Sequence, residues 1–379
     1  MKKRFNTTGL CVPEKHYMAD ISDKLNQVIK MIEYGDYFTI NRPRQYGKTT
    51  MLSQITRYFN DKNDYFVLKI SFEGIGDSPF ESEKSFCETF TDMLINNFNV
   101  VSKNLNESFA ASLSNVNNLK SLSDCLTKLF NLLKYKFILL IDEVDKSSNN
   151  QLFLHFLGTL RNKYLDSIDG QDITFHSVIL AGVHDVKNLK IKLRPNEERK
   201  YNSPWNIAVD FNVDMNLNPK EIKSMLKEFS EAENVSMDLD EIANRIYYFT
   251  SGYPFLVSKI CFDLNEVHKP NAEEWTVSDI DFSVKKLLKQ KNTNFQSLII
   301  NVESDKNLSK LVEEILLENR VINSNQFNPT IEIGQLHGIF SLSDKNLRIH
   351  NKIYEELLYD YMASKIELSL DTKNFNFQS

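Results

Sequence analysis

Up to about residue 181 the chain alternates between short apolar runs and longer segments with helical spacing. The run 137–141 is apolar without a break, which indicates a parallel strand buried on both faces. The pattern predicts strands at 37–40, 66–72, 137–141, 174–181 and 207–211, and helices at 22–34, 49–60, 81–98, 119–135 and 151–165. Strands that alternate with helices predict an α/β core with a parallel sheet.

Beyond residue 215 the apolar spacing becomes helical throughout. Asn218, Pro219 and Glu221 form a typical helix start, with a cap, a first-turn proline and a first-turn acid. Further helices are predicted at 238–250, 254–266, 278–290 and 306–319, and short β-type pieces at 331–333, 339–342 and 347–350. We therefore expect a core at 1–214, a helical, lid-like domain at 215–290, a winged-helix-like domain at 291–365 and a polar, frayed tail at 366–379.

Residues 36–51 carry the most specific motif of the chain. A strand, a turn, Gly47-Lys48-Thr49 and a helix follow one another, which is the arrangement of a phosphate-binding P-loop. In such a loop the backbone N–H groups and the helix N-terminus attract phosphate. Lys48 would reach the β- and γ-phosphates, and the Thr49 hydroxyl would bind Mg²⁺. The nucleotide-binding residues predicted here are Arg44, Gln45, Tyr46, Gly47, Lys48, Thr49 and Thr50.

One position departs from this motif, because Arg42 stands where the first glycine is expected. Arg42 and Arg44 would either hold phosphate or acidic groups, or lie on the surface without a role in binding.

A second motif consists of the apolar strand 138–141 followed by Asp142, Glu143 and Asp145. The carboxyl end of a strand points into the crevice where open α/β sheets bind ligands. We expect Asp142 to hold Mg²⁺, mostly through water, and Glu143 to orient or deprotonate the attacking water. Asp145 would join the metal shell or cap the next segment. The alternative is that acidic residues after a strand merely begin a loop. The P-loop and the acidic motif are informative because they occur together and in this order.

Composition excludes several other classes of protein. The net charge of −6 argues against a strongly basic nucleic-acid binder. The four cysteines are far apart in the sequence, which favours free thiols over a zinc site or disulfides. No apolar run approaches the roughly 18 residues of a membrane helix, and no apolar segment follows the basic N-terminus. We expect a protein of the cytoplasm without a membrane segment.

The chain resembles prokaryotic AAA-like ATPases, which are related to archaeal ATPases and to the STAND class. The resemblance rests on Asn41 to Thr50, the acidic box 142–145, and the segments 5–9, 180–186, 201–208 and 251–254. It covers roughly residues 1–265 and implies that His184 is a sensor touching the γ-phosphate or the lytic water. The alternative is that His184 is a solvated histidine of a loop. The resemblance also implies that Pro254 lies near the base and ribose of the nucleotide. The alternative is that Gly252 and Pro254 only interrupt a helix.

P-loop hydrolases usually need an additional cation on the transferred phosphoryl group. Arg194, in the charged segment after the fourth strand, is the candidate for this arginine finger. The alternative is that Arg194, like its neighbours Arg199 and Lys200, is a solvated charge.

These observations support three hypotheses. The first is an ATPase that uses ATP and Mg²⁺ to drive a conformational change acting on a protein partner or a second copy of the chain. The resemblance to this family suggests a role in anti-phage defence or in another stress response. The second is a nucleotide-gated switch with little turnover. The third is a DNA-binding regulator, which the mixed charges of residues 303–356 support only weakly.

Overall fold

The computed structural model describes residues 2–101, 113, 116–147, 150–183, 203–325, 327–341 and 345–375. The chain divides into two compact units, which we describe separately. The sheet unit comprises Ser22–Arg42 and Lys48–Asp214. The helical unit comprises Met1–Ile21, Pro43–Gly47 and Met215–Ser379.

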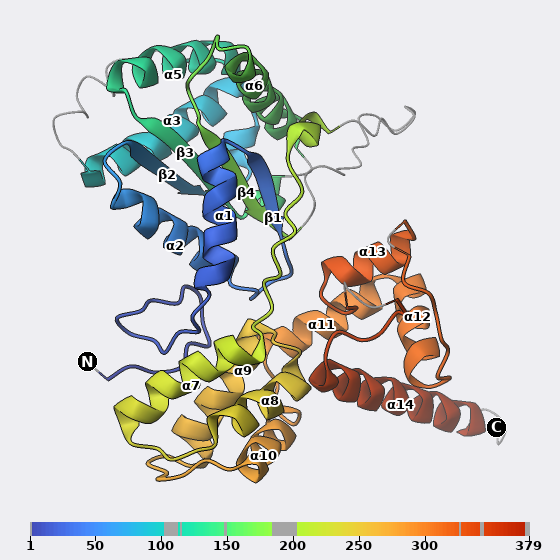
Figure 1. Ribbon diagram of the computed structural model, residues 1–379. Helices are drawn as coiled ribbons and strands as arrows, with labels where there is room; N and C mark the ends of the chain where they lie inside the picture. Colours follow the sequence, from blue (N-terminus) through green and yellow to red (C-terminus); the bar gives the residue numbers. More distant parts are fainter. Residues whose placement is uncertain are drawn as a thin grey trace. The chain divides into compact units, whose positions relative to one another are not determined.

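The sheet unit contains a four-stranded parallel sheet in the order β1-β4-β3-β2 (Figure 1). The strands are β1 (Tyr37–Asn41), β2 (Tyr65–Ser71), β3 (Lys136–Asp142) and β4 (Ser177–Gly182). All residues of β3 after Lys136 are buried, because the strand is central and covered on both faces. The α/β class and the parallel sheet predicted from the apolar runs are confirmed.

Helices cover both faces of this sheet, with α1 (Ser22–Tyr34) and α2 (Lys48–Asn60) on one side (Figure 1). The other side is covered by α3 (Glu83–Val101), α5 (Leu119–Leu133) and α6 (Gln151–Ile168). Aromatic residues dominate this second layer. The ring of Phe130 in α5 stacks on Phe137 of β3, with centroids 3.9 Å apart. The 3₁₀ turns of this unit are η1 (Ser78–Phe80), η2 (Val144–Ser147) and η4 (Pro204–Ile207).

The helical unit begins its main part with α7 (Pro219–Glu233), where Asn218 and Glu221 form the predicted capping arrangement. Residues that precede α1 also belong to this unit, since Phe5 and Tyr17 pack against Phe229. The other helices are α8 (Leu239–Thr250), α9 (Pro254–Phe262), the π-helix η5 (Asp263–His268), α10 (Val277–Leu287), α11 (Thr293–Ser304), α12 (Lys306–Leu316), α13 (Pro329–Leu336) and α14 (Lys352–Phe375).

Two expected strands are absent, and two helical segments were not expected. Residues 207–211 do not form a strand, because η4 extends to Ile207 and only an isolated bridge joins Val209 to Phe38. Residues 331–333 lie in α13 rather than in a strand. Helix α11 was not predicted, and α14 continues to Phe375 through most of the expected tail.

The winged helix and the domain boundaries at 290 and 365 remain predictions. Residues 323 and 346, and 340 and 349, form isolated antiparallel bridges between α12 and α14. Within the described ranges, no helix is long and apolar enough to cross a membrane. None of the four cysteines forms a disulfide.

Candidate functional site

Three strands of the sheet unit end next to one another. Asn41 at the end of β1 is paired with Gly182 at the end of β4, and the Arg42 N–H donates to the Gly182 carbonyl at 3.1 Å. Ile141 near the end of β3 is paired with Leu180. The strand ends therefore gather the beginning of the P-loop, the acidic motif and the segment after β4 at one edge of the sheet, where ligands of open α/β sheets bind.

The two predicted magnesium ligands are in direct contact. Thr49 in the first turn of α2 donates its hydroxyl to Asp142 Oδ2 at 2.7 Å, although the residues are 93 positions apart. Asp142 is the last residue of β3 and is buried. A hydroxyl and a carboxylate at this separation are hard oxygen donors of the kind Mg²⁺ takes, so this pair fits the ion.

Lys48 begins α2 and is 6% exposed. Its ammonium donates to the carbonyl of Arg42 at 2.9 Å, so the side chain folds back onto the turn that precedes it. Gly47 makes this turn possible, because its φ of 76° lies in the left-handed region that favours glycine.

Glu143 has the features of a general base. Its backbone is left-handed (φ 57°), and its N–H donates to Asp142 Oδ1 at 3.0 Å. Burial raises the pKa of the Glu143 carboxyl, Lys48 opposes this effect, and the negative charge of Asp142 adds to it. A carboxyl with a raised pKa at the end of a strand is typical of a catalytic position.

Asp145 joins two segments of the sheet unit. Both of its carboxylate oxygens accept from the Val183 N–H at 2.7 Å, which ties the segment after β3 to the end of β4. Gly182 permits this approach, since a Cβ there would lie 2.5 Å from Asp145 Oδ1. The metal-shell and capping roles that the sequence suggested for Asp145 remain predictions.

Arg42 is an anchor for a distant segment. Its guanidinium donates to the carbonyls of Val213 at 2.9 Å and Phe211 at 3.4 Å, and it lies over the ring of Phe211. Neither the phosphate role nor the surface role expected for Arg42 describes these contacts. The acceptors are backbone carbonyls about 170 positions away, so the sequence contains no signal for them.

Of the remaining P-loop residues predicted to bind nucleotide, Thr50 lies in α2 of the sheet unit, and Arg44, Gln45 and Tyr46 belong to the helical unit. Tyr253 donates its hydroxyl to the carbonyl of Arg44, and Asn294 donates to Gln45 Oε1 at 2.8 Å. The Tyr46 hydroxyl lies 2.6 Å from His350 Nε2. Pro254, which begins α9, adjoins Tyr253 and so follows a residue that contacts the loop. No sequence motif indicated the contacts of Asn294 and His350.

His184 and Arg194 lie outside the described residues. Their sensor and finger roles remain predictions, as do the nucleotide roles of Thr50 and Pro254.

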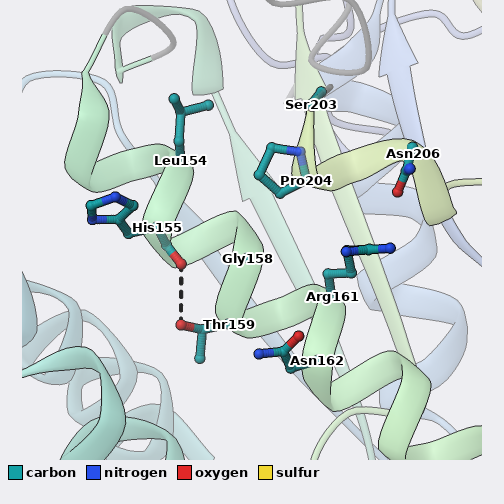
Figure 2. A pocket seen from close by; sticks show the side chains of 9 residues that line it. All are labelled: Leu154, His155, Gly158, Thr159, Arg161, Asn162, Ser203, Pro204 and Asn206. Carbon is teal, nitrogen blue, oxygen red and sulfur yellow. Dashed lines mark hydrogen bonds between the residues drawn. The ribbon is translucent and has the colours of Figure 1, made fainter. Parts of the chain in front are cut away.

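A cavity of about 570 Å³ lies elsewhere in the sheet unit, between α6 and η4 (Figure 2). Arg161 and Asn162 of α6 line it together with Ser203 and Asn206. None of Lys48, Thr49, Asp142 and Glu143 lines this cavity. We therefore assign the candidate site to the strand ends, where these four residues lie.

Comparisons with known proteins concern the family and the fold of the chain. The AAA-like domain family matches residues 14–360 of the chain. The Walker-type ATPase of Pyrococcus abyssi has a similar fold, with a TM-score of 0.60, 14% identity and coverage of 93% of this chain and 99% of that one. The ORC2 protein of Aeropyrum pernix, in ADPNP and ADP complexes, matches with a TM-score of 0.47, 11% identity and coverage of 90% and 93%. No curated protein sequence is significantly similar to this chain.

Proposed function

Since the chain belongs to the AAA-like domain family, we propose that it binds ATP with Mg²⁺ and hydrolyses it to ADP and phosphate. The observation that carries the proposal is the 2.7 Å contact between Thr49 and Asp142. It joins the two motifs that the sequence predicted separately. Lys48 and Glu143 are the chain neighbours of these two residues, so all four belong to one edge of the sheet.

Each residue has a defined task in this reaction. Lys48 exchanges the Arg42 carbonyl for the β- and γ-phosphates of ATP. Thr49 and Asp142 would hold Mg²⁺, which would supply positive charge at the phosphate oxygens. Glu143 orients the attacking water and accepts its proton, and the raised pKa of its carboxyl makes it a stronger base than an ordinary glutamate.

The proposal also includes what the free energy of ATP hydrolysis is used for. Hydrolysis would change the conformation of the chain and so act on a protein partner or on a second copy. Defence or stress remains the biological setting suggested by the resemblance to AAA-like ATPases.

Two variants test the proposal. We expect Lys48→Ala to bind Mg²⁺-ATP weakly and to release little phosphate, while Lys30→Ala, an exposed lysine of α1, behaves as the wild type. Glu143→Gln should bind ATP as the wild type does but hydrolyse it 10²–10⁴-fold more slowly, the usual contribution of a general base. Titration with nucleotide and a phosphate-release assay measure these quantities.

The outcomes separate the hypotheses. If the wild type releases no more phosphate than Lys48→Ala but binds ATP more tightly, the protein is a nucleotide-gated switch. If neither protein binds nucleotide, the proposal is wrong. Unchanged turnover in Glu143→Gln would remove Glu143 from the base role and leave the other assignments in place.

A further inference from the structure

Residues 43–46 of the P-loop contact residues that lie about 200 to 300 positions further along the chain. All of these residues belong to the helical unit. Tyr253 donates to the Arg44 carbonyl, and its ring packs against Tyr46 with centroids 4.5 Å apart. Pro43 lies against Gly338, where a Cβ would come within 2.9 Å of Pro43 Cγ. Residues 43, 44 and 46 of the loop are thus in contact with three separate segments, which contain Tyr253, Gly338 and His350.

The bond between Tyr46 and His350 has a defined direction. Asn351 Oδ1 accepts from the Tyr354 N–H at 2.9 Å, which fixes the orientation of the Asn351 amide. The NH₂ of Asn351 then faces His350 Nδ1 at 3.1 Å, so Nδ1 accepts and Nε2 carries the proton. His350 therefore donates from Nε2 to the Tyr46 hydroxyl. Both side chains are buried, so water competes little with this bond.

Gln45 supplies the second argument. Its φ of 61° is left-handed, a conformation that costs free energy for any residue with a side chain and persists where the surroundings impose it. Asn294 holds the Gln45 side chain at 2.8 Å, and the Tyr354 hydroxyl donates to Asn294 Oδ1 at 2.8 Å. Asn294 and Tyr354 are buried. A rigid two-step network thus fixes the strained residue of the loop.

From these contacts we propose that Tyr46 and His350 are positioning residues for the P-loop. Their hydrogen bond, supported by the contacts of Tyr253 and Asn294, holds residues 43–47 in the shape that binds phosphate. The inference rests on the proposed function, because Gly47 is followed directly by Lys48. If only part of the population has the correct loop shape, the apparent dissociation constant for nucleotide rises in proportion.

The first test needs no nucleotide. We expect amide hydrogen exchange of residues 44–48 in the full chain to become about tenfold faster in Tyr46→Phe and in His350→Leu, which corresponds to about 1.4 kcal/mol for the loss of one buried hydrogen bond. His350→Gln retains an N–H donor and should largely restore the wild-type rate. Tyr359→Phe, an exposed tyrosine of α14, is the matched control and should exchange as the wild type. Unchanged exchange in Tyr46→Phe, the most conservative of these variants, would overturn the proposal.

The second test uses Mg²⁺ and a fluorescent ADP analogue. Tyr46→Phe and His350→Leu should each bind it about tenfold more weakly, and the double variant should bind no more weakly than either single variant. Faster exchange together with wild-type affinity would show that the contact is merely structural and would refute the positioning role. If the wild type binds no nucleotide, the proposed function fails, and the exchange experiment still decides whether the contact holds the loop.

Discussion

At the scale of single residues, we predict that the glycine of the P-loop motif would destabilise the protein at position 42. Arg42→Gly would restore the glycine expected at this position, but it would remove the donor from the Phe211 and Val213 carbonyls. Leaving buried acceptors unpaired costs about 1–3 kcal/mol, so we expect a loss of about 2 kcal/mol in the free energy of unfolding. Chemical denaturation measures it, with Arg42→Lys as the variant that keeps the charge but loses the planar fork. Wild-type stability in Arg42→Gly would contradict the anchoring role.

The same scale shows which residues a sequence can identify. The contact between Thr49 and Asp142 was predictable, because a P-loop places these groups at a strand-turn-helix junction and at a neighbouring strand end. Arg42, Asn294 and His350 were not predictable, because their partners are chosen by tertiary packing and carry no local pattern. The hydrogen bond between Tyr46 and His350 joins positions 304 residues apart. The amino-acid sequence of either segment alone does not indicate this bond.

At the scale of elements, a buried network joins α5, α6 and the segment before β4. Lys163 of α6 donates to Asp172 at 3.1 Å and to Thr127 of α5 at 2.6 Å. Burial opposes ionisation of Asp172, but the hydrogen bonds from Thr174 and the charge of Lys163 together lower the pKa of its carboxyl. Burial lowers the pKa of Lys163, and Asp172 partly offsets this. The pair is therefore a site where stability depends on pH.

The sign of this dependence follows from the lowered pKa of Asp172. A group with a lower pKa in the folded state adds stability above its unfolded value, and this contribution is lost as the pH falls. We expect Asp172→Asn to lower the free energy of unfolding by about 3 kcal/mol at pH 7, because Lys163 loses its buried partner. The difference from wild type should shrink as the pH falls below the ordinary value of 3.8. Glu88→Gln, at an exposed pair with Lys84, is the control and should cost less than about 0.5 kcal/mol. A difference that stays constant down to pH 2 would contradict this account.

The elements themselves were predictable where the apolar period was long. Helix α13 shows that a short apolar pattern does not predict an element. The alternation of Ile331, Glu332 and Ile333 is typical of a strand but is only three residues long. Asn328 caps this helix through the N–H groups of Thr330 and Ile331, and Pro329 occupies its first turn. These start signals outweighed the short alternation. Helix α11 was missed although Asn292 caps it and the buried Phe295, Leu298 and Val302 recur at helical spacing.

At the scale of the whole molecule, the proposed Mg²⁺ site predicts how ligands change stability. A ligand that binds only the folded state at 100 times its dissociation constant stabilises that state by about 2.7 kcal/mol. We expect Mg²⁺-ATP to raise the unfolding midpoint of the full chain, and ATP with a chelator to raise it less. This difference should vanish in Thr49→Val, which lacks the hydroxyl paired with Asp142.

The matched control for this experiment lies in the same helix. Thr56 of α2 donates its hydroxyl to the Leu52 carbonyl, within the helix itself, so Thr56→Val removes the same group without touching the site. Comparing the increment caused by the ligand, rather than the midpoint itself, separates binding from any intrinsic loss of stability. Thr56→Val should keep the full increment of the wild type. If Thr49→Val keeps the Mg²⁺-dependent increment as well, Thr49 does not bind the metal, and its contact with Asp142 serves only to join α2 to β3.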